Sequence, residues 1–463
     1  MKKYVRRWGF LLSLTACTFM AGTGRAAKAE GVTRLAAPEE EEAQRTAWYR
    51  EAKFGMFIHW GPYSLASVEA SWPIMEPESQ WPISEAEYVS LFKRFNPVRY
   101  DPKAWVDLAR EAGQRYVVFT TKHHDGFCMF DSALTDYKVT NTPYGKDVTA
   151  LLAKAAHDAG MPLGFYYSPP DMHHPGYRDI TKPVRDTWHG EPTRPGWAGY
   201  LNYMEGQLRE LLTQYGPVAV IWFDGLDHRE KFDGQRFLKL IHELQPATLV
   251  NNRIGLPGDF ATPEQTIPDR IPTKSAAQGS KDIGAPQGPG PAPVPDFHDF
   301  QLWETCMTIN DTWAYNRNDR HFKSVQELIR DLVNVASKGG NFLLDVGPTP
   351  EGTIQPEFVE RLQAIGKWMK VNGDSIYGTT YGPWQNLPFG KTTAKGGTVY
   401  LHVFNWPSIP HLDLPDLEAA VRQVTVLATG EKVQFQQAKG RLSITVSPRA
   451  PDPDDSVFEI DTR

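Results

Sequence analysis

The feature that most constrains the fold is a repeated unit made of a short apolar run, a loop with polar or aromatic residues, and an amphipathic helix. Apolar runs bounded in this way predict buried strands, and alternation with helices predicts a parallel sheet. The expected strands are residues 54–60, 116–121, 163–168, 218–223, 248–253 and 341–346. The expected helices are residues 105–112, 148–159, 200–215, 237–244, 324–336 and 357–371. The chain length favours a closed (β/α)₈-like barrel, over residues 45–375, rather than an open sheet.

Beyond this region the pattern changes to short strand-like runs separated by turn residues, at 398–404, 421–428 and 442–446. Such runs predict a C-terminal antiparallel β-sandwich over residues 376–463. Residues 279–296 are crowded with Pro and Gly, which indicates a loop or an insertion.

The first 29 residues are typical of an export signal. A positively charged start at residues 2–7 precedes an apolar segment at 8–21 and an Ala27-Lys28-Ala29 cleavage pattern. This predicts a signal peptide over 1–29 and export to the bacterial periplasm or the exterior. A second interpretation is a lipoprotein signal that ends before Cys17, in which case acylation of Cys17 would anchor the protein to a membrane. Residues 30–44 are acidic and polar, and they predict a linker or the start of a helix.

Composition narrows the partners. The net charge of -6, without basic runs in the body of the chain, gives no reason to expect nucleic acid. The content of Trp, Tyr and Phe suits carbohydrate contact, and it also suits any large core. Beyond the signal, Cys128 and Cys306 are too few for a disulfide framework, so stability must come from the core.

One stretch, residues 218–225, leads from apolar residues through Trp222 and Phe223 to the lone carboxylate of Asp224 and then Gly225. A carboxylate at the end of a buried strand must be paired or used, because burial of an unpaired charge is costly. The alternative is an Asp that only caps a turn. Trp222 and Phe223 would form an apolar platform of the kind that stacks on a sugar ring.

Active sites of such barrels lie at the carboxyl ends of the strands. Hydrogen-bonding, aromatic and charged side chains that fit a small polyhydroxylated ring stand at these ends: His59, His123, His124, Tyr166, Trp222, Asp224 and Arg253. A single His there could equally be a satisfied core residue. Imidazole and carboxylate are also zinc ligands. However, adjacent strand residues point to opposite faces, so His123 and His124 would share an ion only if the strand has ended between them. We therefore expect no metal and no cofactor.

Glycoside hydrolysis needs two carboxyl groups, of which Asp224 supplies one. For the second, the residue pattern leaves Glu264, Glu304 and Asp345 open.

Six motifs, taken together and in order, resemble the α-L-fucosidases of glycoside hydrolase family 29, and the resemblance covers residues 45–375. The motifs are Lys53-Phe-Gly-Met-Phe-Ile-His-Trp-Gly61, Lys122-His-His-Asp-Gly-Phe-Cys128, Gly164-Phe-Tyr-Tyr-Ser168, Ile221-Trp-Phe-Asp-Gly225, Trp303-Glu-Thr-Cys-Met307 and Asn341-Phe-Leu-Leu-Asp-Val-Gly-Pro348.

The resemblance implies an exo-acting, retaining α-L-fucosidase that acts on fucosylated oligosaccharides or glycoconjugates. Asp224 matches the family's nucleophile, and Glu264 is the best match for the acid/base, with Glu304 as the fallback. The fucose-binding positions carried over are His59, Trp72, His123, His124, Tyr166, Trp222 and Arg253. Many relatives have Asn-Asp-Arg where this chain has Asn251-Asn252-Arg253, and Glu-Trp where it has Ser71-Trp72.

Two alternatives stay open at this point. One is a fucosidase restricted to α1,3/4 linkages, whose specificity would reside in residues 258–296. The other is a secreted fucose-binding protein without catalysis. Convergence of Asp224 with a second carboxyl group would favour an enzyme.

Overall fold

The computed structural model describes residues 38–76, 81, 83–226, 228–274, 299–415, 417, 419–438 and 440–462. The predicted signal peptide, Cys17 and the segment 279–296 lie outside these residues. Residues 38–44, predicted as a linker or a helix start, form the first part of helix α1 (Pro38–Ala52), so this part of the predicted linker is helical. In the part of the chain that the structure describes, no helix combines the length and the apolar character needed to cross a membrane.

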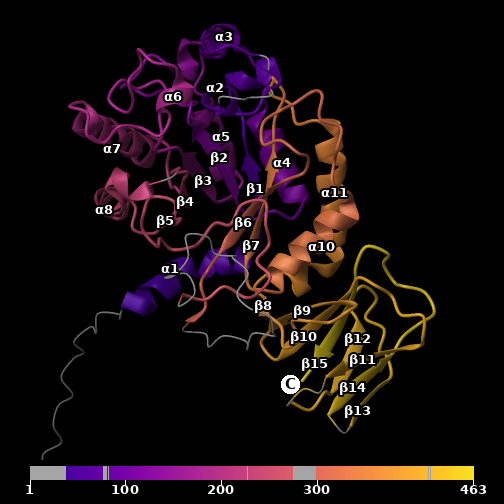
Figure 1. Ribbon diagram of the computed structural model, residues 1–463. Coiled ribbons are helices and arrows are strands. Elements are labelled where there is room, and N and C mark those ends of the chain that lie inside the picture. Colours follow the sequence, from indigo (N-terminus) through magenta and orange to yellow (C-terminus); the bar gives the residue numbers. More distant parts are fainter. Residues whose placement is uncertain are drawn as a thin grey trace, which may run out of the picture. The chain divides into compact units, whose positions relative to one another are not determined.

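The chain divides into two units, Met1–Glu41 and Glu42–Arg463, and the second unit contains all the sheets described below. Its first sheet has seven parallel strands in the order β5-β4-β3-β2-β1-β7-β6 (Figure 1). The strands are β1 (Phe54–Ile58), β2 (Val117–Lys122), β3 (Leu163–Tyr167), β4 (Val220–Phe223), β5 (Leu249–Val250), β6 (Glu304–Thr308) and β7 (Asn341–Val346). Every strand residue is buried, as expected of parallel strands covered by helices. Only β6 was absent from the predicted strands.

An irregular segment stands between β5 and β6, where a barrel would have its remaining strand. The N–H of Asp259 donates to the carbonyl oxygen of Val250 (2.6 Å) beside β5. The N–H of Gln265 donates to the carbonyl oxygen of Cys306 in β6 (2.9 Å). Residues 259–265 thus bridge the two edges of the sheet. The predicted (β/α)₈-like barrel is confirmed, with seven regular strands and one irregular segment.

Helices connect the strands, and their ends lie within a few residues of the predicted ones. The long helices are α4 (Pro102–Glu111), α5 (Val148–Asp158), α7 (Trp197–Gln214), α8 (Gly234–Leu244), α10 (Val325–Ala336) and α11 (Pro356–Asn372). The short ones are α2 (Trp72–Met75), α3 (Glu85–Ser90) and α6 (Val184–Thr187). Asp101, Asp147 and Ser324 cap α4, α5 and α10, because each side chain accepts a backbone N–H of the first turn.

The C-terminal region contains two antiparallel sheets, of orders β12-β15-β10-β9-β8 and β11-β14-β13 (Figure 1). The strands are β8 (Thr380–Tyr381), β9 (Gly390–Lys395), β10 (Thr398–Val403), β11 (His411–Pro415), β12 (Gln423–Val426), β13 (Phe435–Ala438), β14 (Arg441–Thr445) and β15 (Ser456–Asp461). Leu401 and Phe458 of the larger sheet share one apolar core with Leu414 and Leu442 of the smaller. Two sheets around a shared core confirm the predicted sandwich.

Candidate active site

Asp224 lies directly after β4, and Gly225, the next residue, allows the chain to pass close to the backbone of Arg253. The N–H of Gly225 donates to the carbonyl oxygen of Arg253, three residues after β5 (3.1 Å). A Cβ atom on Gly225 would lie 2.3 Å from that oxygen, closer than any real contact. Glycine is therefore needed for Asp224 and Arg253 to approach each other.

Two side chains donate hydrogen bonds to the carboxylate of Asp224, and the imidazole of His124 lies beside it. The hydroxyl of Tyr166 donates to Oδ2 (2.8 Å), Nη1 of Arg253 donates to Oδ1 (2.8 Å), and Nε2 of His124 lies 3.5 Å from Oδ2. Burial raises the pKa of Asp224, but the charge of Arg253 and the hydrogen bonds from Tyr166 and Arg253 outweigh it and hold the pKa below its usual range. Asp224 is therefore ionised at neutral pH.

Arg253 brings a second carboxylate to the same place. Its Nη1 donates to Oε2 of Glu264 as well (2.8 Å), so the two bonded carboxylate oxygens lie at most twice that distance, 5.6 Å, apart. Nε and Nη2 of Arg253 are fixed by the side chain and the carbonyl of Thr262 (2.9 Å each). The Asp224 side chain is 14% exposed and that of Glu264 is 42% exposed. One carboxylate is enclosed, and the other faces solvent.

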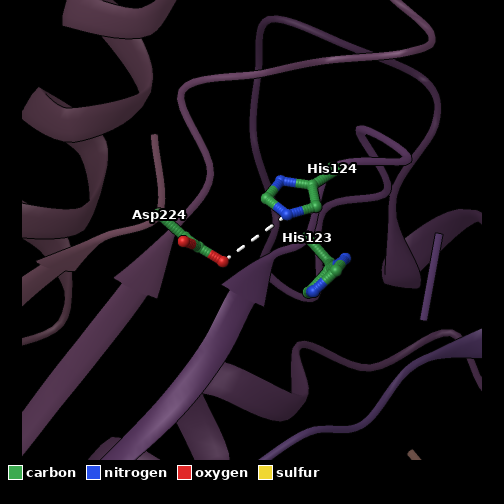
Figure 2. A group of neighbouring side chains, drawn as sticks. All are labelled: His123, His124 and Asp224. Atoms are coloured by element: carbon green, nitrogen blue, oxygen red, sulfur yellow. Dashed lines mark ion pairs between the residues drawn. The ribbon is translucent and has the colours of Figure 1, made fainter. Parts of the chain in front are cut away.

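His123 and His124 both lie beside Asp224 (Figure 2). Alternation of side chains along a strand does not apply to them, because β2 ends at Lys122 and both residues lie beyond it. Burial lowers the pKa of both imidazoles, that of His124 to about 4, so both are neutral near pH 7. One ligand atom each of His123, His124 and Asp224 lie within 4.8 Å of one another, which could hold a metal ion. The guanidinium of Arg253 beside Asp224 opposes a cation at this point.

His59, at the end of β1, faces the same region. Its Nδ1 lies 2.7 Å from Oδ1 of Asp345, and its ring centroid lies 5.7 Å from that of His123. Burial alone would lower the pKa of His59, but the Asp345 carboxylate raises it above its ordinary value. Asp345, one of the three candidates for the second carboxyl group, is thus engaged with His59.

Glu304, another candidate, lies in a closed network below Trp222. Trp222 Nε1 donates to Oε1 (2.9 Å), the Tyr49 hydroxyl donates to Oε2 (2.7 Å), and the Tyr116 hydroxyl donates to Oε2 as well. Burial raises the pKa of Glu304 to about 7. Among the described residues, Trp222 is the one member of the Asp224 site that donates a hydrogen bond to this carboxyl group.

The aromatic platform differs from the prediction. The ring of Trp222 stacks on Tyr166, with centroids 5.6 Å apart, and Arg253 lies over it at 4.8 Å. Phe223 contacts Tyr167 instead. Placing Phe223 beside Trp222 was wrong, because successive strand residues alternate between faces.

Trp72, in α2, completes the predicted set, since its ring lies 6.2 Å from that of His124. Two residues were missed. The ring of Trp313 lies 5.1 Å from that of His59, and the buried carboxylate of Glu69 accepts the N–H of Trp313 (2.9 Å). A lone acid shortly after the first strand was the only signal for Glu69, and its partner lies 244 residues away.

A parallel α/β barrel that presents two carboxylates around one arginine, in a wall of imidazole and aromatic rings, is typical of a glycoside hydrolase. The family model "Alpha-L-fucosidase" matches residues 24–374. The chain belongs to the α-L-fucosidase family.

Individual relatives agree. The structure is similar to that of α-L-fucosidase isoenzyme 1 from Paenibacillus thiaminolyticus, with a TM-score of 0.80 and 37% identity over 91% of this chain and 100% of that one. It is also similar to a family 29 α-L-fucosidase from Bacteroides thetaiotaomicron, trapped as a covalent intermediate, with a TM-score of 0.74 and 28% identity over 94% and 98% of the two chains. An α-L-fucosidase from Dictyostelium discoideum is 29% identical over 80% of each chain.

Proposed function

We propose that this retaining α-L-fucosidase is exo-acting and removes terminal α-L-fucosyl groups from oligosaccharides or glycoconjugates, with Asp224 as nucleophile and Glu264 as acid/base. The observation that carries this assignment is the bridge from Nη1 of Arg253 to both carboxylates, which keeps their bonded oxygens within 5.6 Å. Retaining glycosidases hold their carboxyl groups about 5–5.5 Å apart, whereas inverting ones need about 6.5–9.5 Å. The covalent intermediate trapped in the Bacteroides relative supports the same mechanism.

In the first step, an oxygen of ionised Asp224 bonds to the anomeric carbon while the glycosidic bond breaks and protonated Glu264 gives its proton to the leaving oxygen. In the second step, Glu264 takes a proton from water, whose oxygen displaces Asp224. L-Fucose leaves with its configuration retained. The lowered pKa of Asp224 supports its role as the nucleophile, because it keeps that group ionised. The exposure of Glu264 supports its role, because both the aglycone and the water must reach it.

The fucosyl ring is proposed to lie against the side chains that surround Asp224: His59, Trp72, His123, His124, Tyr166, Trp222 and Arg253. Their mutual ring contacts and hydrogen bonds support this assignment. Tyr166 stacks on the Trp222 ring and Arg253 lies over it, so we expect Trp222 to act mainly as the floor under these two residues.

The test is release of L-fucose from an aryl α-L-fucoside by the wild type, Asp224→Ala and Glu264→Ala, each with and without azide. Azide should restore turnover of Asp224→Ala with β-fucosyl azide as product, because it replaces the nucleophile on the opposite face. It should restore Glu264→Ala with the α product, because it attacks the fucosyl-enzyme.

Full activity of Glu264→Ala would reject its role as acid/base. A wild type that binds L-fucose but cleaves neither the aryl fucoside nor fucosylated oligosaccharides would favour the binding-protein alternative. A panel of α1,2-, α1,3-, α1,4- and α1,6-linked oligosaccharides would test the alternative restricted to α1,3/4 linkages.

We also propose that the protein is exported, with cleavage after Ala29 rather than acylation at Cys17. The positive start, the apolar segment and the cleavage pattern support this proposal. Mass spectrometry of the mature N-terminus distinguishes the two forms, since an acylated Cys17 would carry the mass of its lipid.

A further inference from the structure

The two neighbouring histidines each rest on a serine hydroxyl, but the two hydroxyls have different second partners. Ser168 Oγ lies 2.6 Å from Nδ1 of His124 and 2.6 Å from the carbonyl oxygen of Pro170. A carbonyl can only accept, so the single proton of Ser168 goes to Pro170. Nδ1 of His124 must then carry a hydrogen and donate it to Ser168. Because His124 is neutral, its Nε2 is left with a lone pair, on the side that faces Asp224.

Ser71 reverses this pattern for His123. Its Oγ lies 2.7 Å from Nδ1 of His123 and accepts the N–H of Asp125 (2.8 Å). A backbone N–H can only donate, so the proton of Ser71 is free for another acceptor. Among the described residues, Nδ1 of His123 is the acceptor within reach of that proton. Nδ1 of His123 is therefore unprotonated, and its Nε2 carries the hydrogen.

The backbone around Ser71 holds this arrangement in place. Ser71 has a positive φ of 60°, which is uncommon for a residue other than glycine. Its own N–H donates to the hydroxyl of Tyr88 (2.8 Å), which donates in turn to Oδ2 of Asp125 (3.0 Å). A strained conformation persists only where surrounding contacts enforce it. Here the contacts keep the Ser71 hydroxyl between His123 and Asp125.

We propose that Ser71 and Ser168 are positioning residues that hold His123 and His124 in opposite neutral tautomers, so that the pair offers one N–H donor and one lone-pair acceptor to a single hydroxyl of the fucosyl group. A hydroxyl can donate and accept at once, and it satisfies both imidazoles when its oxygen lies between them. One nitrogen of each ring lies within 4.8 Å of the other, near enough for one oxygen to reach both. A methyl group or hydrogen at that position would leave both nitrogens unpaired. The binding of a fucosyl hydroxyl by the two histidines rests on the proposed function, whereas the assignment of their tautomers does not.

The tautomers are tested by NMR on the full chain labelled with ¹⁵N in its histidine rings, near pH 7. Loss of one ring signal set in His123→Gln and in His124→Gln assigns the two residues. We expect a proton on Nε2 of His123 and on Nδ1 of His124. The same tautomer at both residues, or an imidazolium at His124, would overturn the proposal.

Variants then test the serines. Ser168→Ala should remove the single tautomer of His124 and weaken binding of L-fucose about tenfold, the size of one hydrogen bond. Ser168→Thr keeps the hydroxyl, so it should keep the single tautomer of His124 and the wild-type affinity for L-fucose. The matched control is Ser337→Ala, a buried hydroxyl that donates to the Asn334 carbonyl (2.8 Å), which should change neither.

The sugar is tested with 2-, 3- and 4-deoxy-L-fucose as inhibitors. One of the three should bind the wild type about tenfold more weakly than L-fucose, yet bind Ser168→Ala as well as L-fucose does. An equal loss of affinity for the deoxy sugar in the wild type and in Ser168→Ala would refute the proposal that one fucosyl hydroxyl bridges the two histidines. Correct tautomers in a protein that neither binds nor cleaves fucosides would refute the proposed function alone.

Discussion

Glu304 has the pKa expected of a glycosidase acid, yet its surroundings predict that it does no chemistry. A carboxyl group with a pKa near 7 in a sugar-binding barrel is a natural candidate for the acid/base. Among the described residues, however, the donors to the Glu304 carboxyl group are Tyr49, Tyr116 and Trp222, and the residue is 1% exposed. We predict that Glu304→Gln lowers kcat less than tenfold but changes how stability depends on pH.

The sign follows from the pKa in the two states. Burial raises the pKa of Glu304 from its ordinary value of 4.5 to about 7 in the folded protein. Below pH 4.5 the group is protonated in both states. Between pH 4.5 and pH 7, Glu304 is deprotonated in the unfolded chain but still protonated in the folded protein. The unfolding free energy of the wild type therefore falls as pH rises through this range, and the fall levels off above pH 7. At about 1.4 kcal/mol per pH unit, the loss between pH 5 and pH 8 is about 2–3 kcal/mol.

The assay is urea unfolding of the wild type and Glu304→Gln at pH 5, 6, 7 and 8. Relative to the wild type, Glu304→Gln should gain about 2–3 kcal/mol of unfolding free energy from pH 5 to pH 8, because glutamine does not titrate. Glu243→Gln is the control, since its side chain is 62% exposed and it should leave the pH dependence unchanged. A stability difference that is constant from pH 5 to pH 8 would refute the burial argument, and loss of activity with azide rescue would make Glu304 a catalytic group.

Two further predictions concern single contacts. Tyr166→Phe removes a hydroxyl that stabilises ionised Asp224, so the pKa of Asp224 should rise. The acidic limb of the kcat/KM pH profile should therefore move to higher pH. An acidic limb at the same pH as in the wild type would show that this hydrogen bond does not lower the pKa of Asp224. Asp171→Asn leaves the buried ammonium of Lys122 without its ion-pair partner, which lies 3.1 Å away. Urea unfolding should show a loss of about 3–5 kcal/mol of unfolding free energy. A loss below about 1 kcal/mol would show that the aromatic rings around Lys122 are enough to stabilise its charge.

The sequence could predict those site residues that directly follow a recognisable buried strand. Asp224 and Arg253 each follow a buried apolar run, and parallel neighbours end at the same edge, so their meeting follows from the strand assignments. His123 and His124 show the limit of this reasoning. Whether two adjacent side chains share a face depends on whether the strand ends one residue earlier or later, and strand boundaries are the least reliable part of a sequence-based assignment.

The remaining parts depend on contacts that have no local pattern. Glu264 lies in a segment without strand periodicity, held in place by hydrogen bonds to both edges of the sheet. Glu69 and Trp313 meet beside His59, although their positions in the chain are unrelated. Phe223 is different, because strict alternation along β4 already excluded it from the face of Trp222.

The bridge through Arg253 suggests why one cation serves two carboxyl groups. With the proposed roles, Asp224 is ionised and Glu264 protonated before the reaction, whereas in the fucosyl-enzyme Asp224 is an uncharged ester and Glu264 is ionised. The two groups together carry one negative charge at both stages. Nη1 of Arg253 bonds to both, so the same guanidinium can balance that charge wherever it resides, without movement of the arginine. Thr262 fixes the other nitrogens and so keeps Nη1 between the carboxylates. Preorganisation of this kind lowers the barrier of both steps, because no dipole or charge has to be reoriented as the reaction proceeds.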